Sequence, residues 1–306
     1  MTRDYAAVIV DVCRGGTVES RHQMAAVLVD EHGGQIARYG EADMVTFWRS
    51  AAKPFQAIPW VEDGTHDRWR WGAEELAIIC ASHAGSATHA GLVRRMLADI
   101  GLTEDDLLCD DALKARHECS GNHAGILAAC RFHGWDVPTY QHPQHPAQLA
   151  GLHAVAAASG VAAGDIPVGV DGCGIATYAT PLAAAARAYA LLPRLCPPVA
   201  DAMRAHPLLV WGEGGLDTVV MQAFPGTVSK AGAEGLGCVT LPGGGGLVVK
   251  AVDGADRAVE PALVALLVRH LGLDEVPVVA AGLARPPVRN DRGDAVGELV
   301  ARLPER

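Results

Sequence analysis

The distribution of strand-like and helix-like segments along the chain constrains its fold more than any other feature. Near the start, residues 6–13, 24–29 and 35–39 carry the apolar, β-branched and aromatic side chains of strands, separated by glycine-containing turns. Near the end, residues 247–252 and a hairpin over 288–299 show the same character, whereas most of the intervening segments are helical. We therefore predict an α+β protein in which one antiparallel sheet joins the chain ends and is flanked by helices.

Several helices in the middle of the chain have clear sequence boundaries. Residues 86–100 place apolar side chains on one face at helical spacing and are followed by Gly101. A second helix is predicted to stop at Gly134, and a third to run from His145-Pro146 to Gly160. The chain has 306 residues, half of them hydrophobic, which is enough for a large core. We predict a single elaborated catalytic domain over residues 1–306, with a helical subdomain at about 73–165.

The charge and apolar pattern exclude several classes of partner. A formal charge of -10 argues against sequence-independent binding of nucleic acid or of anionic membranes, so a small molecule is the expected partner. The chain lacks an apolar run of about 18 residues, so no membrane span is predicted. The first residues lack the apolar core of a signal peptide. We expect a cytoplasmic protein whose eight cysteines are mostly buried thiols.

A serine and a lysine stand three residues apart in the segment Phe47 to Gln56. On one helical turn, Ser50 and Lys53 would face the same way. A neutral lysine amine can take the proton of a serine hydroxyl, which makes the serine a nucleophile. Only four of the 25 basic residues are lysines, and arginine cannot act as such a base. The pattern predicts Ser/Lys acyl-transfer chemistry, and the alternative is a surface lysine in the first turns of a helix.

Three loops of small residues precede or follow predicted helices and strands. They are residues 80–85, 119–125 and 171–174, and each combines glycine with polar or thiol side chains. Loops of this composition allow the backbone to approach a ligand closely. We predict that they line one shared pocket.

Several motifs of this chain, taken in order, resemble the rhizobial-type L-asparaginases (asparaginase II). The motifs are Arg49-Ser50-x-x-Lys53-Pro54, Cys80-Ala81-Ser82-His83, Cys119-Ser120-Gly121-x-His123-Ala124-Gly125, Asp171-Gly172-Cys173-Gly174, Asp217-Thr218 and Lys230-x-Gly232-Ala233-Glu234-Gly235. They extend over about residues 40–250. The resemblance implies a serine β-lactamase and glutaminase-like fold and hydrolysis of L-asparagine to L-aspartate and ammonia.

The resemblance also implies roles for individual residues. Two Ser/Lys tandems are attributed to the family, and by motif they correspond to Ser50 with Lys53 and to Ser82 with Lys230. Two neighbouring cationic lysines would depress each other's pKa, which would help to keep one amine neutral. The expected substrate-binding residues are Arg49, Gly121, Asn122, His123 and Asp171. Arginine suits an α-carboxylate and aspartate an α-ammonium group.

The family further places a zinc beside the pocket, held by two cysteines and a lysine, although the chemistry itself requires no cofactor. Cys119 and Cys173 match the cysteines, whereas Asn122 stands at the position of the lysine. Asparagine is a poor zinc donor, so two cysteines alone would make a weak site unless His123 or water completed a tetrahedron. The alternative is that Asn122 donates hydrogen bonds to substrate and that the two thiols are metal-free. A homodimer is also expected from the resemblance.

A second departure from the family lies before Asp217-Thr218, where the family usually has an arginine and this chain has Leu216. The leading prediction is an asparaginase-type amidohydrolase. The first alternative keeps the Ser/Lys pair but assigns another amide, ester or lactam, or an acyl-transfer or cyclisation reaction. The second alternative is a catalytically silent binding protein.

Overall fold

The computed structural model describes residues 2–110 and 112–305, and the chain divides into two compact units. The first, here called the sheet unit, comprises residues up to 45, residues 181–190 and residues from 219 onward. The second, here called the helical unit, comprises residues 46–180 and 191–218. The predicted helical part, about 73–165, falls inside the helical unit. We describe each unit by itself.

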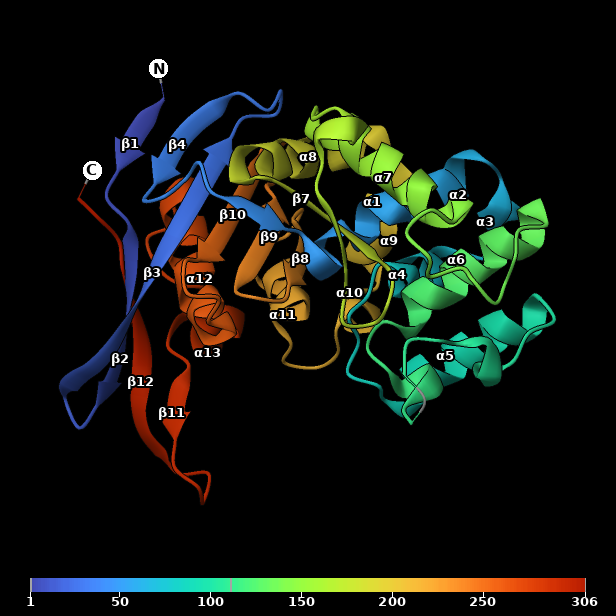
Figure 1. The fold of residues 1–306 in the computed structure, drawn as a ribbon. Helices are drawn as coiled ribbons and strands as arrows, with labels where there is room; N and C mark the ends of the chain where they lie inside the picture. The colour runs from blue at the N-terminus through green and yellow to red at the C-terminus, as the bar shows by residue number, and fades with distance from the viewer. Residues whose placement is uncertain (1, 111, 306) are drawn as a thin grey trace. The chain divides into compact units, whose positions relative to one another are not determined.

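The sheet unit is built on a nine-stranded, largely antiparallel sheet (Figure 1). Along its main path the order is β11-β12-β2-β3-β10-β9-β8, while β4 pairs with β3 and β1 pairs in parallel with β4. The strands are β1 (Arg3–Tyr5), β2 (Val8–Arg14), β3 (Thr17–Val29), β4 (Gln35–Tyr39), β8 (Val228–Gly232), β9 (Leu236–Thr240), β10 (Gly246–Ala251), β11 (Pro287–Arg289) and β12 (Ala295–Arg302).

The two ends of the chain meet in this sheet. Strand β12 runs antiparallel to β2, with Leu299 opposite Val12. This pairing confirms the prediction that one antiparallel sheet joins the chain ends. Strand β3 begins at Thr17, earlier than the strand predicted over 24–29, because its polar first half still pairs with β2.

Helices cover both faces of the central strands, which explains why β8, β9 and β10 are almost entirely buried. On one face, Gly237 of β9 lies against helix α12 (Val259–Leu271), where an added Cβ would come within 2.8 Å of Val259. On the other face, Gly246 of β10 lies against helix α8 (Leu182–Leu195), and an added Cβ would be 2.1 Å from the Ala186 carbonyl oxygen. Short helices complete this unit: α11 (Leu216–Ala223) contributes its last residues, and α13 (Ala281–Ala284) packs on α12.

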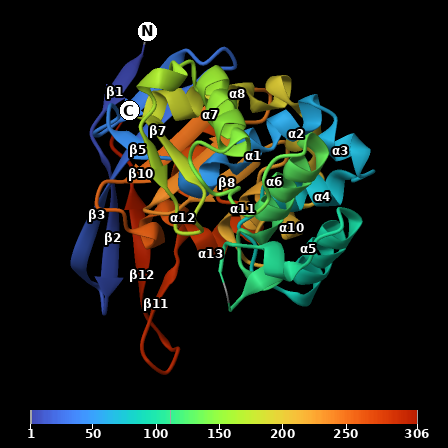
Figure 2. The same ribbon diagram turned by 45° about the vertical axis from the view of Figure 1, so that its right-hand side comes forward.

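The helical unit is a cluster of helices with a small sheet of three strands, in the order β5-β7-β6. Helix α4 packs against α6 and α9. Helix α6 also packs against α5 (Figure 2). The elements are β5 (Val45–Phe47), η1 (Arg49–Ala52), α1 (Lys53–Gln56), α2 (Ile58–Glu62), α3 (Thr65–Arg68), α4 (Ala73–Ile79), α5 (Ala87–Asp99), α6 (Ser120–His133), α7 (Pro146–Ser159), β6 (Val168–Val170), β7 (Ala176–Pro181), α9 (Pro197–Ala205) and α10 (Pro207–Val210).

The predicted helix boundaries in this unit are confirmed. Helix α6 ends at Gly134 and helix α7 at Gly160, and both glycines have a positive φ, as expected of left-handed caps. Within the described residues, every helix is too short or too polar to cross a membrane. The mixed fold of sheet and helices agrees with the α+β prediction.

Candidate active site

The segment that carries Ser50 and Lys53 is anchored to strand β7. The Trp48 amide donates to the Tyr178 carbonyl at 2.9 Å, and the Arg49 amide donates to Thr177 Oγ1 at 3.0 Å. Arg49 has a φ of 49°, a left-handed conformation that costs a non-glycine residue free energy and that is found most often at functional sites. The chain then turns through η1 into α1, so Ser50 lies at the start of the helical segment.

Lys53 is buried, and its ammonium group is fully hydrogen-bonded. Lys53 Nζ donates to the Ala81 carbonyl at 2.6 Å, to Ser82 Oγ at 3.1 Å and to Cys119 Sγ at 3.2 Å. The side chain is only 2% exposed. An ammonium group has three N–H donors, and these three acceptors use all of them. The structure therefore pairs Lys53 with Ser82 rather than with Ser50.

The loop that presents Ser82 is held by backbone hydrogen bonds. The Ser82 amide donates to the Val210 carbonyl at 3.0 Å, and the His83 amide donates to the Glu118 carbonyl at 3.1 Å. Ser82 itself is 9% exposed. The hydroxyl is therefore fixed beside the Lys53 amine by the backbone of neighbouring segments.

Charge and burial shift the pKa values of this cluster in opposite directions. Burial acts to lower the pKa of Lys53, but the Cys119 and Cys173 sulfurs outweigh it and the pKa is raised. A hydrogen bond from Cys173 and the charge of Lys53 hold the pKa of Cys119 well below its usual range. The pKa of the Cys173 thiol is raised, because it hydrogen-bonds to Cys119 and is buried. These shifts favour an ammonium on Lys53 beside a thiolate on Cys119. The expectation that two lysines help to keep one amine neutral involves Lys230 of the other unit and stays a prediction.

The other members of the predicted Ser/Lys pairs are placed differently. Ser50 is partly exposed at the start of the Lys53 segment. Lys230 belongs to the sheet unit, where it is buried on β8 and its amine donates to the Ala231 carbonyl at 2.9 Å. The predicted pairing of Ser82 with Lys230 joins the two units and stays a prediction.

Arg49 and Asp171, the two residues expected to hold the charged ends of a substrate, form an ion pair. Both Arg49 Nε and Nη2 lie 2.8 Å from Asp171 Oδ1, which also accepts the Gly172 amide at 2.6 Å. The two side chains are 25% and 13% exposed. Asp171 is two residues from Cys173, so the ion pair adjoins the Lys53 cluster.

The other predicted substrate-binding residues lie at the start of helix α6. Gly121 meets helix α4: an added Cβ would be 2.2 Å from the Ile78 carbonyl oxygen. The Asn122 amide nitrogen donates to the Ile79 carbonyl at 3.1 Å, while its Oδ1 is buried without a partner among the described residues. These contacts give Gly121 a packing role and fix the orientation of Asn122. His123 is fully buried.

Residues at the positions of the family's zinc site make other contacts in this structure. Among residues 2–110 and 112–305, no three His, Cys, Asp or Glu side chains are grouped to hold a metal ion. Lys53 Nζ contacts the Cys119 sulfur that a metal would use, and the Asn122 side chain is engaged with helix α4. The arrangement favours a lysine in electrostatic contact with the thiolate over a metal ion.

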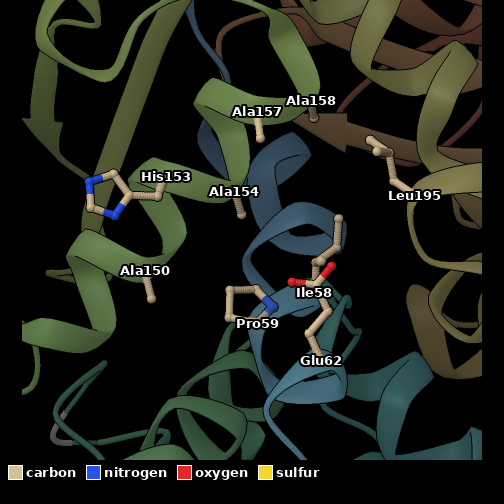
Figure 3. A pocket seen from close by; sticks show the side chains of 9 residues that line it. All are labelled: Ile58, Pro59, Glu62, Ala150, His153, Ala154, Ala157, Ala158 and Leu195. Carbon is tan, nitrogen blue, oxygen red and sulfur yellow. The ribbon is translucent and has the colours of Figure 1, made fainter.

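A separate groove opens elsewhere in the helical unit, between helices α2 and α7 (Figure 3). It has a volume of about 350 Å³ and is mostly apolar. It is lined by Ile58, Pro59, Glu62, Ala150, His153, Ala154, Ala157, Ala158 and Leu195. None of the predicted site residues lines it.

Two residues of the site were missed by the sequence reasoning. Tyr140 places its hydroxyl 2.6 Å from His123 Nδ1, and Gln141 Nε2 donates to the Cys173 carbonyl at 2.7 Å. Both lie in an irregular segment between α6 and α7, and Tyr140 is 17 residues after His123. A tyrosine followed by a glutamine in a loop carries no distinctive sequence pattern.

Comparison with known proteins adds a family and distant structural likenesses. The family model described as L-asparaginase II matches residues 10–301. No curated protein matches this chain. Among solved structures, a probable glutaminase from Bacillus subtilis complexed with 6-diazo-5-oxo-L-norleucine is 13% identical, with a TM-score of 0.38, over 82% of this chain and 83% of that one. A β-lactamase from Mycobacterium bovis is 15% identical, with a TM-score of 0.34, over 85% and 94% of the two chains.

Proposed function

Because this chain belongs to the L-asparaginase II family, we propose that it hydrolyses the side-chain amide of L-asparagine to L-aspartate and ammonia. Family membership supports an amidohydrolase, and the substrate and the roles of individual residues are our proposal. The observation that carries it is the hydrogen bond between the buried Lys53 amine and Ser82 Oγ, next to the Arg49–Asp171 ion pair.

In the proposed reaction the hydroxyl of Ser82 attacks the amide carbon. Its proton passes to the Lys53 amine and then to the leaving nitrogen, which departs as ammonia. Water hydrolyses the resulting ester, which releases aspartate and restores the serine. In the free chain Lys53 is an ammonium with all three N–H groups engaged, so it must lose one proton before it can accept that of Ser82.

The Arg49–Asp171 pair suits an α-amino acid. Each partner can exchange its protein contact for a contact with substrate: the guanidinium for the α-carboxylate, and the carboxylate for the α-ammonium group. The pair is partly exposed, whereas Lys53 and Ser82 are buried, so the charged end of the substrate would lie toward solvent and its amide toward the nucleophile.

A second candidate is a Ser/Lys hydrolase or acyltransferase that acts on another small amide, ester or lactam. Two observations favour it: Asn122 replaces the family's lysine, and Leu216 stands where the family usually has an arginine. Each change removes a positively charged side chain that the family has at that position. A substrate whose carboxylate is placed differently from that of asparagine could then be bound.

Ammonia release by the purified chain tests the proposal. Asparagine should yield stoichiometric aspartate and ammonia, with glutamine as the comparison substrate. Ser82→Ala should lower kcat by a factor on the order of 10³ or more, as loss of a nucleophile does. Ser50→Ala is the matched variant. If Ser50→Ala loses activity by that factor and Ser82→Ala keeps full activity, Ser50 and not Ser82 is the nucleophile. No ammonia from either amide would favour the second candidate.

A further inference from the structure

The hydrogen bonds around Tyr140 determine which nitrogen of His123 carries the ring proton. Tyr140 is fully buried, and its hydroxyl oxygen accepts the Leu108 amide at 2.9 Å. The same hydroxyl lies 2.6 Å from His123 Nδ1. A backbone N–H can only donate, so its hydrogen bond to the Tyr140 oxygen leaves the phenol proton free to be donated. Among the described residues, His123 Nδ1 is the one acceptor for that proton. Nδ1 then accepts, and a neutral ring must carry its proton on Nε2.

The ring is neutral and its Nε2 has no partner within the described chain. An imidazolium carries protons on both nitrogens, so a ring whose Nδ1 accepts the Tyr140 hydroxyl proton is neutral. Nε2 is buried and makes no hydrogen bond to the described residues. A buried N–H without a hydrogen-bond partner costs about 1–3 kcal/mol of stability, so its presence needs an explanation. A ligand oxygen that accepts from this N–H would provide one.

His123 lies beside the Lys53 cluster. It is four residues after Cys119, so the two share one face of the first turn of α6. The electrostatic effects of Cys119 and Lys53 both act on the His123 ring. The His123 ring is therefore within electrostatic reach of the groups proposed to carry out amide hydrolysis.

We propose that Tyr140 is a positioning residue that fixes His123 as the Nε2–H tautomer, so that this N–H donates to an oxygen of the bound substrate. The inference rests on the proposed function for the identity of the substrate but not for the tautomer. In this tautomer His123 would not offer Nε2 to a zinc ion, since a protonated Nε2 cannot bind a metal. The Tyr140 hydroxyl itself does not touch substrate.

Nitrogen NMR of the full-length protein, labelled at histidine and without substrate, tests the tautomer directly. The His123 resonances are assigned by their loss in His123→Gln. Between pH 6 and 8 we expect an unprotonated Nδ1 and a protonated Nε2. In Tyr140→Phe the ring should become a mixture of both tautomers. A protonated Nδ1 in the wild-type protein, or an unchanged ring in a folded Tyr140→Phe, would overturn the proposal whatever the activity.

A pair of His123 variants tests the same point if Tyr140→Phe does not fold. Glutamine can place an amide N–H near the position of Nε2, whereas asparagine reaches only the position of Nδ1. We expect His123→Gln to stay within about 10-fold of the wild-type kcat/KM and His123→Asn to lose about 100-fold. Equal losses would contradict a donor at Nε2. A loss in kcat indicates donation to the amide oxygen in the transition state, and a rise in KM alone indicates a substrate carboxylate.

Failure of this inference and failure of the proposed function have different signatures. If the chain releases no ammonia from asparagine but shows the expected tautomer, the positioning by Tyr140 stands and the substrate is wrong. If asparagine is hydrolysed and the His123 proton lies on Nδ1, the function stands and the inference is wrong.

Discussion

The packing of Gly121 allows a test of whether this glycine is needed for helix packing or for substrate binding. Gly121 lies where α6 crosses α4, and an alanine Cβ would be 2.2 Å from the Ile78 oxygen and 2.8 Å from the Ile78 carbon. Both are backbone atoms of a buried helix, so no side chain can rotate to make room. The two helices must move apart by about 1 Å to restore normal van der Waals contact. Overpacking of this kind lowers the free energy of unfolding by about 3 kcal/mol.

The matched control is Gly91→Ala. Gly91 lies within helix α5 of the same unit, and an added Cβ meets nothing within 4 Å. This change should stabilise the protein by about 0.5–1 kcal/mol, because alanine has the higher helix propensity. Urea unfolding followed by far-ultraviolet circular dichroism measures both variants against the wild type. The reasoning is refuted if Gly121→Ala loses less than about 1 kcal/mol. A raised KM for asparagine at unchanged stability would instead make Gly121 a substrate contact.

Three further predictions concern Lys53, the metal and Asp11. Lys53→Arg keeps the positive charge but cannot accept a proton, so activity should fall by about 10³ or more; retained activity would limit Lys53 to charge pairing. Elemental analysis should find zinc in less than about a tenth of the protein molecules, and stoichiometric zinc would defeat the argument from Asn122. Burial acts to raise the pKa of Asp11, but its hydrogen bonds with Arg302 and Arg21 outweigh it and the pKa is lowered. A carboxyl whose pKa is lowered by folding stabilises the folded state at every pH above its pKa in the unfolded chain. Asp11→Asn should therefore lower the free energy of unfolding by about 1 kcal/mol at pH 7. In unfolding experiments, the difference between variant and wild type should shrink as the pH falls below about 4.

The fold was largely predictable because its signals are local. Apolar, β-branched and aromatic residues marked the strands at both ends, and Gly134 and Gly160 marked the ends of α6 and α7. Strand β1 was missed because its three residues, Arg3 to Tyr5, are polar or aromatic and pair only at the edge with β4. Such a strand is defined by its partner and not by its own composition.

The site was predictable as a set of loops but not as a set of contacts. Motifs placed Ser82, Cys119 and Cys173 in the right loops, and the structure brings Lys53 to all three through hydrogen bonds or charge. Tyr140 could not be found in this way, because its role depends on a distance to His123 that no sequence spacing records.

The choice of partner by Lys53 follows from the cost of burying a charge. Sequence spacing offered Ser50, three residues earlier, but a serine hydroxyl supplies one acceptor to a group with three donors. A buried ammonium with unpaired N–H groups would be strongly destabilising. The turn at Ala81 and Ser82 supplies two acceptors at once, and the Cys119 thiolate supplies the third together with the opposite charge. Lys53 therefore bonds to the groups that satisfy all three of its N–H donors, although Ser50 is nearer along the chain. Because Ser82 is one of those groups, we infer that Ser82 is the nucleophile.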